Sequence, residues 1–176
     1  MPRSSVKSSV APVSRPTVPF LLSQVGAHAA GSFADRIAPL GCKPYHVGIL
    51  SVLDKQPGLT QQGLADVLGM FPSRLVGLLD ELGKAKLIER RESPEDRRIH
   101  AVHLTKAGRE TVAKAWKIAW KLEEDLCAGL EAKELEQLAD LLGRIVTQQK
   151  ITPGVHPGYR RMNAGCGEEE PAKRKG

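Results

Sequence analysis

The 176-residue sequence lacks the short motifs that mark the common enzyme classes. It has no Gly-x-Ser-x-Gly elbow, no Walker-type phosphate loop, no His-Glu-x-x-His pair and no glycine-rich dinucleotide turn. Its acidic residues are scattered over polar helix faces. We therefore expect a protein that is not an enzyme and that has no cofactor.

Cysteine is scarce, and the five histidines do not cluster. The three cysteines, Cys42, Cys127 and Cys166, do not have the spacing of a metal site. An odd number of cysteines is typical of a reducing compartment, and polar residues interrupt the only N-terminal stretch that imitates a secretory signal. No run is long and apolar enough to span a membrane. These absences predict a cytoplasmic protein without a metal.

A formal net charge of +6 and a pI near 9.4 favour an anionic partner. Most of this charge lies near the ends, because residues 1–19 carry +3 and residues 152–176 carry +2, which leaves +1 for residues 20–151. Within that central region, residues 84–109 hold eight Lys/Arg against four Asp/Glu. A solvated charged hairpin has a similar balance, so the local motif must carry the inference.

The two ends differ in composition from the middle. Residues 1–19 are rich in Ser, Pro and Val, and residues 152–176 combine Pro-Gly pairs with a run of three Glu and a basic end. Both are predicted to be disordered tails. Residues 20–151 are then a single domain.

Within that domain, residues 60–82 have the pattern of two short helices joined by a turn. Thr60 is a good N-cap, Gly69 supplies a helix stop, and Pro72 fits the first turn of the next helix. The apolar stripe of the second helix consists of Leu75, Leu78, Leu79 and Leu82. The pattern is typical of a helix-turn-helix, whose second helix enters the DNA major groove, and it also fits an ordinary helical hairpin.

A charged β-hairpin is predicted directly after these helices. Residues 87–91 and 99–104 are typical of strands, and residues 93–96 (Ser-Pro-Glu-Asp) form turns readily. A helix-turn-helix followed by a hairpin is a winged helix. The loop carries Arg97 and Arg98, and arginine suits a narrow, electronegative minor groove.

With these elements in place, residues 64–105 resemble the winged helix of the MarR family, the multiple-antibiotic-resistance type of bacterial regulator. The matching segments are residues 64–69 (Leu-Ala-Asp-Val-Leu-Gly), 78–82 (Leu-Leu-Asp-Glu-Leu), 87–90 (Leu-Ile-Glu-Arg), 96–98 (Asp-Arg-Arg) and 102–105 (Val-His-Leu-Thr). The last two are similar to the family's wing signature, Asp-x-Arg followed by Val-x-Leu-Thr. The helical patterns on either side extend the resemblance to residues 20–151.

The resemblance implies roles for particular residues. Asp96 braces the wing loop, and Arg98 probes the minor groove. Ser73 and Arg74, near the start of the second helix, are our candidates for reading base edges in the major groove. The full set of expected DNA-contacting residues is Thr60, Gln61, Gln62, Ser73, Arg74, Arg90, Arg91, Asp96, Arg97 and Arg98.

The sequence departs from the family pattern at two positions. Phe71 stands where a capping Ser or Asn is usual, and Gly77 stands where many members have a large polar or basic residue. Gly77 removes a contact from the recognition helix and weakens it by roughly 1 kcal/mol relative to alanine. The family pattern therefore does not fix which residues read the bases.

Further helices are predicted at residues 20–40, 44–54, 106–130 and 134–149. In the resembled family the first and last helices interlock with a second chain, which implies dimerisation helices at 20–40 and 106–150 around a winged helix at 44–105. The expected seam residues are Leu135, Leu138, Leu142 and Ile145. A larger monomeric core also explains these apolar faces.

Members of this family often bind small phenolic or aromatic effectors in the crevice between the dimer helices and the winged helix. The residues expected to line such a crevice are His28, Phe33, Tyr45, His46, Trp116 and Trp120. Core or dimer packing is the alternative role of the tryptophans, and it is the one that we favour for any individual residue.

The sequence thus predicts a mainly α fold with a small β-hairpin wing, a winged helix-turn-helix with additional dimerisation helices. The protein is predicted to be a ligand-responsive transcriptional regulator that binds double-stranded DNA as a homodimer on a pseudo-palindromic operator. Of the two kinds of regulator, a repressor is favoured over an activator. Two alternatives remain, a winged helix that binds proteins and has no DNA site of its own, and a redox-sensing regulator that works through Cys42.

Overall fold

The computed structural model describes residues 15–92, 100–152, 154–156 and 158–161. Helices dominate, and the strands form one small antiparallel sheet, so the predicted fold class is confirmed. The elements are α1 (Val18–Ile37), the 3-10 helix η1 (Ala38–Leu40), α2 (Pro44–Lys55), β1 (Leu59–Thr60), α3 (Gln61–Leu68), α4 (Pro72–Lys84), β2 (Ile88–Glu92), β3 (His100–Leu104), α5 (Lys106–Leu126), α6 (Ala132–Gln148) and α7 (Gly158–Arg161).

The helix-turn-helix is formed by α3 and α4, and its boundaries follow local chemistry. The Thr60 side chain accepts a hydrogen bond from the backbone N–H of Gly63 at 3.0 Å and so caps α3. Gly69 ends α3 in a left-handed conformation with φ 64°, which glycine adopts without strain. Pro72 begins α4. These three sequence predictions are confirmed.

The sheet has the strand order β1-β3-β2, and both pairings are antiparallel. Arg90 lies opposite Val102, and Ile88 lies opposite Leu104. Val102 and Leu104 are buried on the face that packs on the core. The two-residue strand β1 was not predicted, because so short a segment has no alternating pattern.

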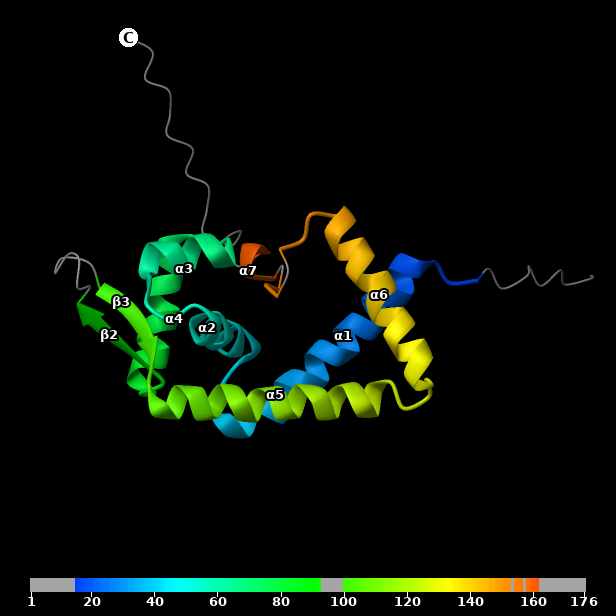
Figure 1. Cartoon of the computed structure of the whole chain (residues 1–176), viewed down its shortest axis with the longest axis horizontal. Coiled ribbons are helices and arrows are strands. Elements are labelled where there is room, and N and C mark those ends of the chain that lie inside the picture. Colours follow the sequence, from blue (N-terminus) through cyan, green and yellow to red (C-terminus); the bar gives the residue numbers. More distant parts are fainter. Residues whose placement is uncertain (1–14, 93–99, 153, 157, 162–176) are drawn as a thin grey trace, which may run out of the picture.

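The elements are arranged around the long helix α5 (Figure 1). Both α1 and α2 pack on α5. The winged helix lies at the end of the molecule where α5 begins, and α6 lies at the opposite end (Figure 1). The hydrophobic core lies within the winged helix and against α5, and it includes Ile49, Leu50, Leu64, Leu79 and Val102. In contrast, α6 has no buried residue within this single chain.

The prediction of a disordered tail from residue 152 onward is wrong for its first part. Where the structure describes this segment, the chain folds back and forms the short helix α7. Tyr159 is buried there and packs in the hydrophobic core. The sequence did not reveal this contact. The abundant Pro and Gly are typical of a disordered tail, and a single buried aromatic residue gives no repeating apolar pattern.

The predicted helix at 106–130 is four residues too long, since α5 ends at Leu126 and a turn precedes α6.

In the described part of the chain, no helix has the length and apolarity that a membrane crossing requires. Nor do the described residues bring together three side chains of His, Cys, Asp or Glu in a way that holds a metal ion.

Candidate nucleic-acid interface

The outer face of α4 presents Ser73 and Arg74 to solvent. Both residues are exposed and lie in the first turn of the helix, whereas the leucines on the opposite face are buried. Among the described residues, Arg74 forms no ion pair. The N-terminal end of a helix also carries partial positive charge and unpaired N–H groups, which favour anions. The start of α4 can therefore accept a phosphate or a base edge.

The three expected DNA-contacting residues at the start of α3 differ in how exposed their side chains are. The Thr60 hydroxyl is committed to the N-cap and is partly buried. Gln61 is also partly buried, whereas Gln62 is exposed and donates a hydrogen bond to Asp66 at 2.9 Å. Thr60 thus fixes the helix start, and Gln62 has the most open side chain of the three.

At the base of the wing, both predicted arginines pair with carboxylates. Arg90 on β2 donates to Asp80 on α4 at 2.7 Å, and Arg91 pairs with Glu89. The Arg90 and Asp80 side chains are 45% and 48% exposed, so the pair contributes little to stability, at most about 1 kcal/mol. It links the recognition helix to the wing. The expected wing-tip residues Asp96, Arg97 and Arg98 lie outside the described residues.

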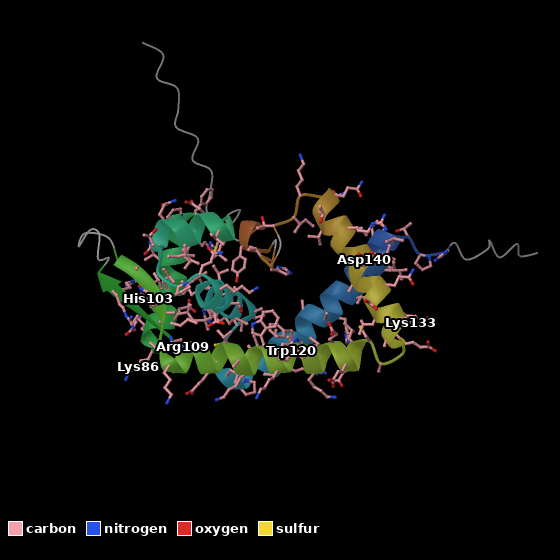
Figure 2. The ribbon with its side chains drawn as sticks, viewed as in Figure 1. Lys86, His103, Arg109, Trp120, Lys133 and Asp140 are labelled. Carbon is pink, nitrogen blue, oxygen red and sulfur yellow. The ribbon has the colours of Figure 1, made fainter. Side chains whose placement is uncertain are left out.

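A second joint links the wing base to α5. The Thr105 hydroxyl donates to the backbone oxygen of Lys86 at 2.7 Å and accepts from the N–H of Gly108 at 3.0 Å. A side chain at Gly108 would overlap the backbone oxygen of Leu87, so glycine permits this close approach. Lys86 and Arg109 both lie at this end of the molecule, far from Lys133 and Asp140 on α6 (Figure 2).

Behind the recognition helix, His46 on α2 contacts Glu81 on α4. The backbone N–H of Lys43 points at His46 Nδ1 at 3.4 Å, which leaves the proton on Nε2 to be donated to the Glu81 carboxylate at 3.1 Å. Burial lowers the pKa of His46, and the Glu81 carboxylate partly opposes this shift. The sequence placed His46 in a ligand crevice and missed this role, because its partner lies 35 residues away.

The predicted ligand residues are not all brought together. Phe33 and Trp116 line a cavity of about 460 Å³ between α1, α2 and α5. Trp120 lines a neighbouring hollow that it shares with Trp116, and the two indole centroids are 6.3 Å apart. Tyr45 and His46 are not among the lining residues of either hollow, and His28 is exposed on α1.

Apolar side chains remain exposed at the end of the molecule opposite the wing. On α6, Leu138 and Ile145 are each 38% exposed, and Leu135 and Leu142 are partly buried. The first two turns of α1 expose further large apolar residues. We refer to the set Val18, Phe20, Leu21, Leu22, Val25, Leu138, Leu141 and Ile145 as the apolar end.

Comparison with known proteins places these features in one family. A model described as the MarR family matches residues 40–99. A protein of Thauera aromatica assigned to transcriptional regulation of the hcr operon is 33% identical over 113 residues, which is 64% of this chain and 68% of that protein.

Solved structures agree. A transcriptional repressor, CouR, solved on a 23-mer DNA duplex, is 31% identical and has a TM-score of 0.65 over 74% of this chain and 92% of its own. The reduced form of MarR from E. coli has a TM-score of 0.68 over 76% of this chain and 98% of its own; at 23% identity it supports the fold alone. The winged helix with its added helices, and these relatives, establish that the chain belongs to the MarR family of transcriptional regulators.

Proposed function

We propose that this MarR-family regulator is a homodimeric, effector-responsive repressor of a pseudo-palindromic operator. The observation that carries the proposal is the exposed first turn of α4, where Ser73 and Arg74 point away from the core. A helix presented in this way fits the major groove. DNA-bound structures of the similar proteins CouR and MarR support the same partner.

Dimerisation is supported by the apolar end. Its side chains come from both α1 and α6, and several are more than 40% exposed in the single chain. Monomeric proteins rarely expose a contiguous apolar patch of this kind. A second copy of the chain, with the same patch, can cover it by twofold symmetry.

Effector responsiveness is supported by the cavity between α1, α2 and α5. Its lining is mainly apolar and includes the aromatic residues Phe33 and Trp116, with Lys55 near the indole at 5.9 Å. This combination suits a small aromatic ligand that carries a negative charge. The cavity adjoins both α2 of the winged helix and α5, so its contents can influence how the two are arranged.

A redox mechanism through Cys42 has little support. The thiol is buried, with 5% of the residue exposed, and burial raises the pKa of Cys42. The thiolate is the form that reacts with oxidants, so both properties make this cysteine unreactive.

Selection of bound fragments from genomic DNA tests the proposal. We expect enriched fragments to share a site with twofold symmetry and half-sites about one helical turn apart. The logarithm of the binding constant should fall linearly with the logarithm of salt concentration, with a slope of about −0.9 per phosphate contact. Recovery of no fragment, or protection of a single half-site, would favour a winged helix that binds proteins instead.

A further inference from the structure

The C-terminal segment after α6 returns to the winged helix and packs against α2. We refer to its described residues, 152, 154–156 and 158–161, as the strap. In Figure 1, α7 lies between α3 and the end of α6, so the strap connects the two ends of the molecule. None of the functional residues expected from the sequence lies in it.

A notch in α2 receives Tyr159 of the strap. The notch is at Gly48, in the interior of the helix, where a side chain would overlap the Tyr159 hydroxyl. Glycine is unfavourable in a helix interior, so the space it leaves has a structural use at this position. Tyr159 is only 4% exposed and donates a hydrogen bond to the backbone oxygen of Tyr45 at 2.7 Å, across 114 residues of sequence.

The same segment closes one side of the cavity described above. Thr152, Val155 and His156 form a wall opposite the residues from α1, α2 and α5. Val155 is partly buried and packs on the core. A smaller hollow of about 90 Å³ separates the strap from Leu68 at the end of α3. The strap therefore borders both the cavity and the C-terminal end of α3.

We propose that the strap is a gate on this cavity, held shut by Tyr159 in the notch at Gly48. A molecule enters or leaves the cavity when Tyr159 withdraws and the wall formed by Val155 and His156 opens. Because the strap also joins α6 to α2, the same movement frees α2 from the segment that follows α6. The statement that the cavity holds an effector rests on the proposed function, whereas the docking of the strap does not.

A double-mutant cycle in the full-length protein tests the docking. Gly48→Ala should lower the melting temperature, because the new methyl group displaces Tyr159. In a Tyr159→Ala background, Gly48→Ala should raise the melting temperature instead, because alanine is the better helix former and nothing remains in the notch.

Gly83→Ala is the matched control. Gly83 is also in a helix, and a side chain there meets nothing within 4 Å, so its effect should be equal in both backgrounds. Far-UV circular dichroism establishes that each variant is folded at the starting temperature. A Gly48→Ala shift of the same sign and size in both backgrounds overturns the docking of Tyr159 in the notch.

Entry of an aromatic anion tests the gate. The probe is 8-anilinonaphthalene-1-sulfonate, and binding is followed in a stopped-flow instrument by quenching of tryptophan emission, since Trp116 lines the cavity. Entry should be several-fold faster in Gly48→Ala and Tyr159→Ala, less accelerated in Tyr159→Phe, which keeps the ring, and unchanged in Gly83→Ala. Equal rates in all variants, or no binding to Tyr159→Ala, overturn the gate. Neither experiment uses DNA, so a failure to find an operator is a separate result.

Discussion

At the scale of single residues, Arg74 is the side chain from which we expect sequence discrimination. Its guanidinium forms no ion pair with another described residue, and it lies in the exposed first turn of α4. Such a side chain is able to make two hydrogen bonds to one guanine. Arg90 and Arg91, at the base of the wing, are each already paired with a carboxylate.

Arg74→Ala should therefore cost about 1–3 kcal/mol on the operator and much less on a scrambled duplex. The measurement is a fluorescence-anisotropy titration of both duplexes at one salt concentration. Lys84→Ala, at the other end of the same helix, is the control for loss of one positive charge. An equal loss on both duplexes would make Arg74 a phosphate contact.

The wing tip should behave in the opposite way. Arg98→Ala is expected to weaken binding to operator and scrambled DNA together, because a minor-groove arginine responds mainly to negative potential and groove width. Asp96→Ala should give a smaller loss of the same kind, since it only loosens the loop. The same titrations measure both variants. Unchanged affinity of Arg98→Ala for both duplexes would mean that the wing does not touch DNA.

Local rules account for the residues that were predicted well. Thr60, Gly69 and Pro72 act on neighbours within about one helical turn, so the sequence alone revealed their roles. The partner of Arg90 is different, because Asp80 is brought near only when β2 packs beside α4. Pairings of this kind depend on how the elements pack.

At the scale of elements, Gly77 lowers the helical stability of α4, although the fold does not require a glycine at this position. It lies in the interior of α4, and a side chain there meets nothing within 4 Å. Gly77→Ala should therefore raise the free energy of unfolding by roughly 0.5–1 kcal/mol. Urea unfolding of the two proteins measures the difference. A decrease would show that the position is constrained in a way that the open space around it does not indicate.

The contact between α2 and α4 through His46 makes stability depend on pH. Burial lowers the pKa of His46 in the folded chain, so the unfolded chain binds the proton more readily. The stabilising effect of keeping this histidine neutral is complete above about pH 6.5, the unfolded value, and is lost as pH falls toward the lower folded pKa.

Melting temperatures at pH 7.5 and pH 5.5 should reveal this dependence when wild type and His46→Gln are compared. From pH 7.5 to pH 5.5 the melting temperature of the wild-type protein should fall more than that of His46→Gln, which has no group to protonate at that position. Parallel decreases would assign the pH dependence to other groups. Glu81→Gln is a useful companion, because removing the carboxylate should deepen the loss in acid.

The elements themselves were well predicted, with errors concentrated at their ends. The pattern of apolar residues identified α4 and β3 because each buries one face within the same small domain. The same reasoning failed for β1, which has two residues, and for the last turn predicted for α5. Tertiary packing decides such boundaries.

At the scale of the whole molecule, the apolar end is expected to be covered by a second copy. Leu138→Asp would place a charge in that interface and should produce monomers or aggregates. Multi-angle light scattering measures the mass directly. Gln137→Asp, one residue away and exposed, introduces the same charge as a control. A wild-type mass for Leu138→Asp would locate the dimer interface elsewhere.

Long-range assembly is also where the sequence was least informative. The dimerisation and ligand residues were chosen by family resemblance. The strap was missed because Tyr159 lies 111 residues after Gly48, the glycine against which it packs. A notch made by the absence of a side chain leaves no apolar pattern. Only the folded chain brings Gly48 and Tyr159 together.

The close contact between Gly108 and Leu87 couples the position of the wing to the tilt of α5. With 21 residues, α5 is about 31 Å long at 1.5 Å per residue, so a tilt of about 5° displaces one end by roughly 3 Å relative to the other. A displacement of that size exceeds the few tenths of an ångström over which a hydrogen bond to DNA keeps its strength. A tilt of this size at α5 would therefore be enough to break hydrogen bonds between the wing and a DNA groove.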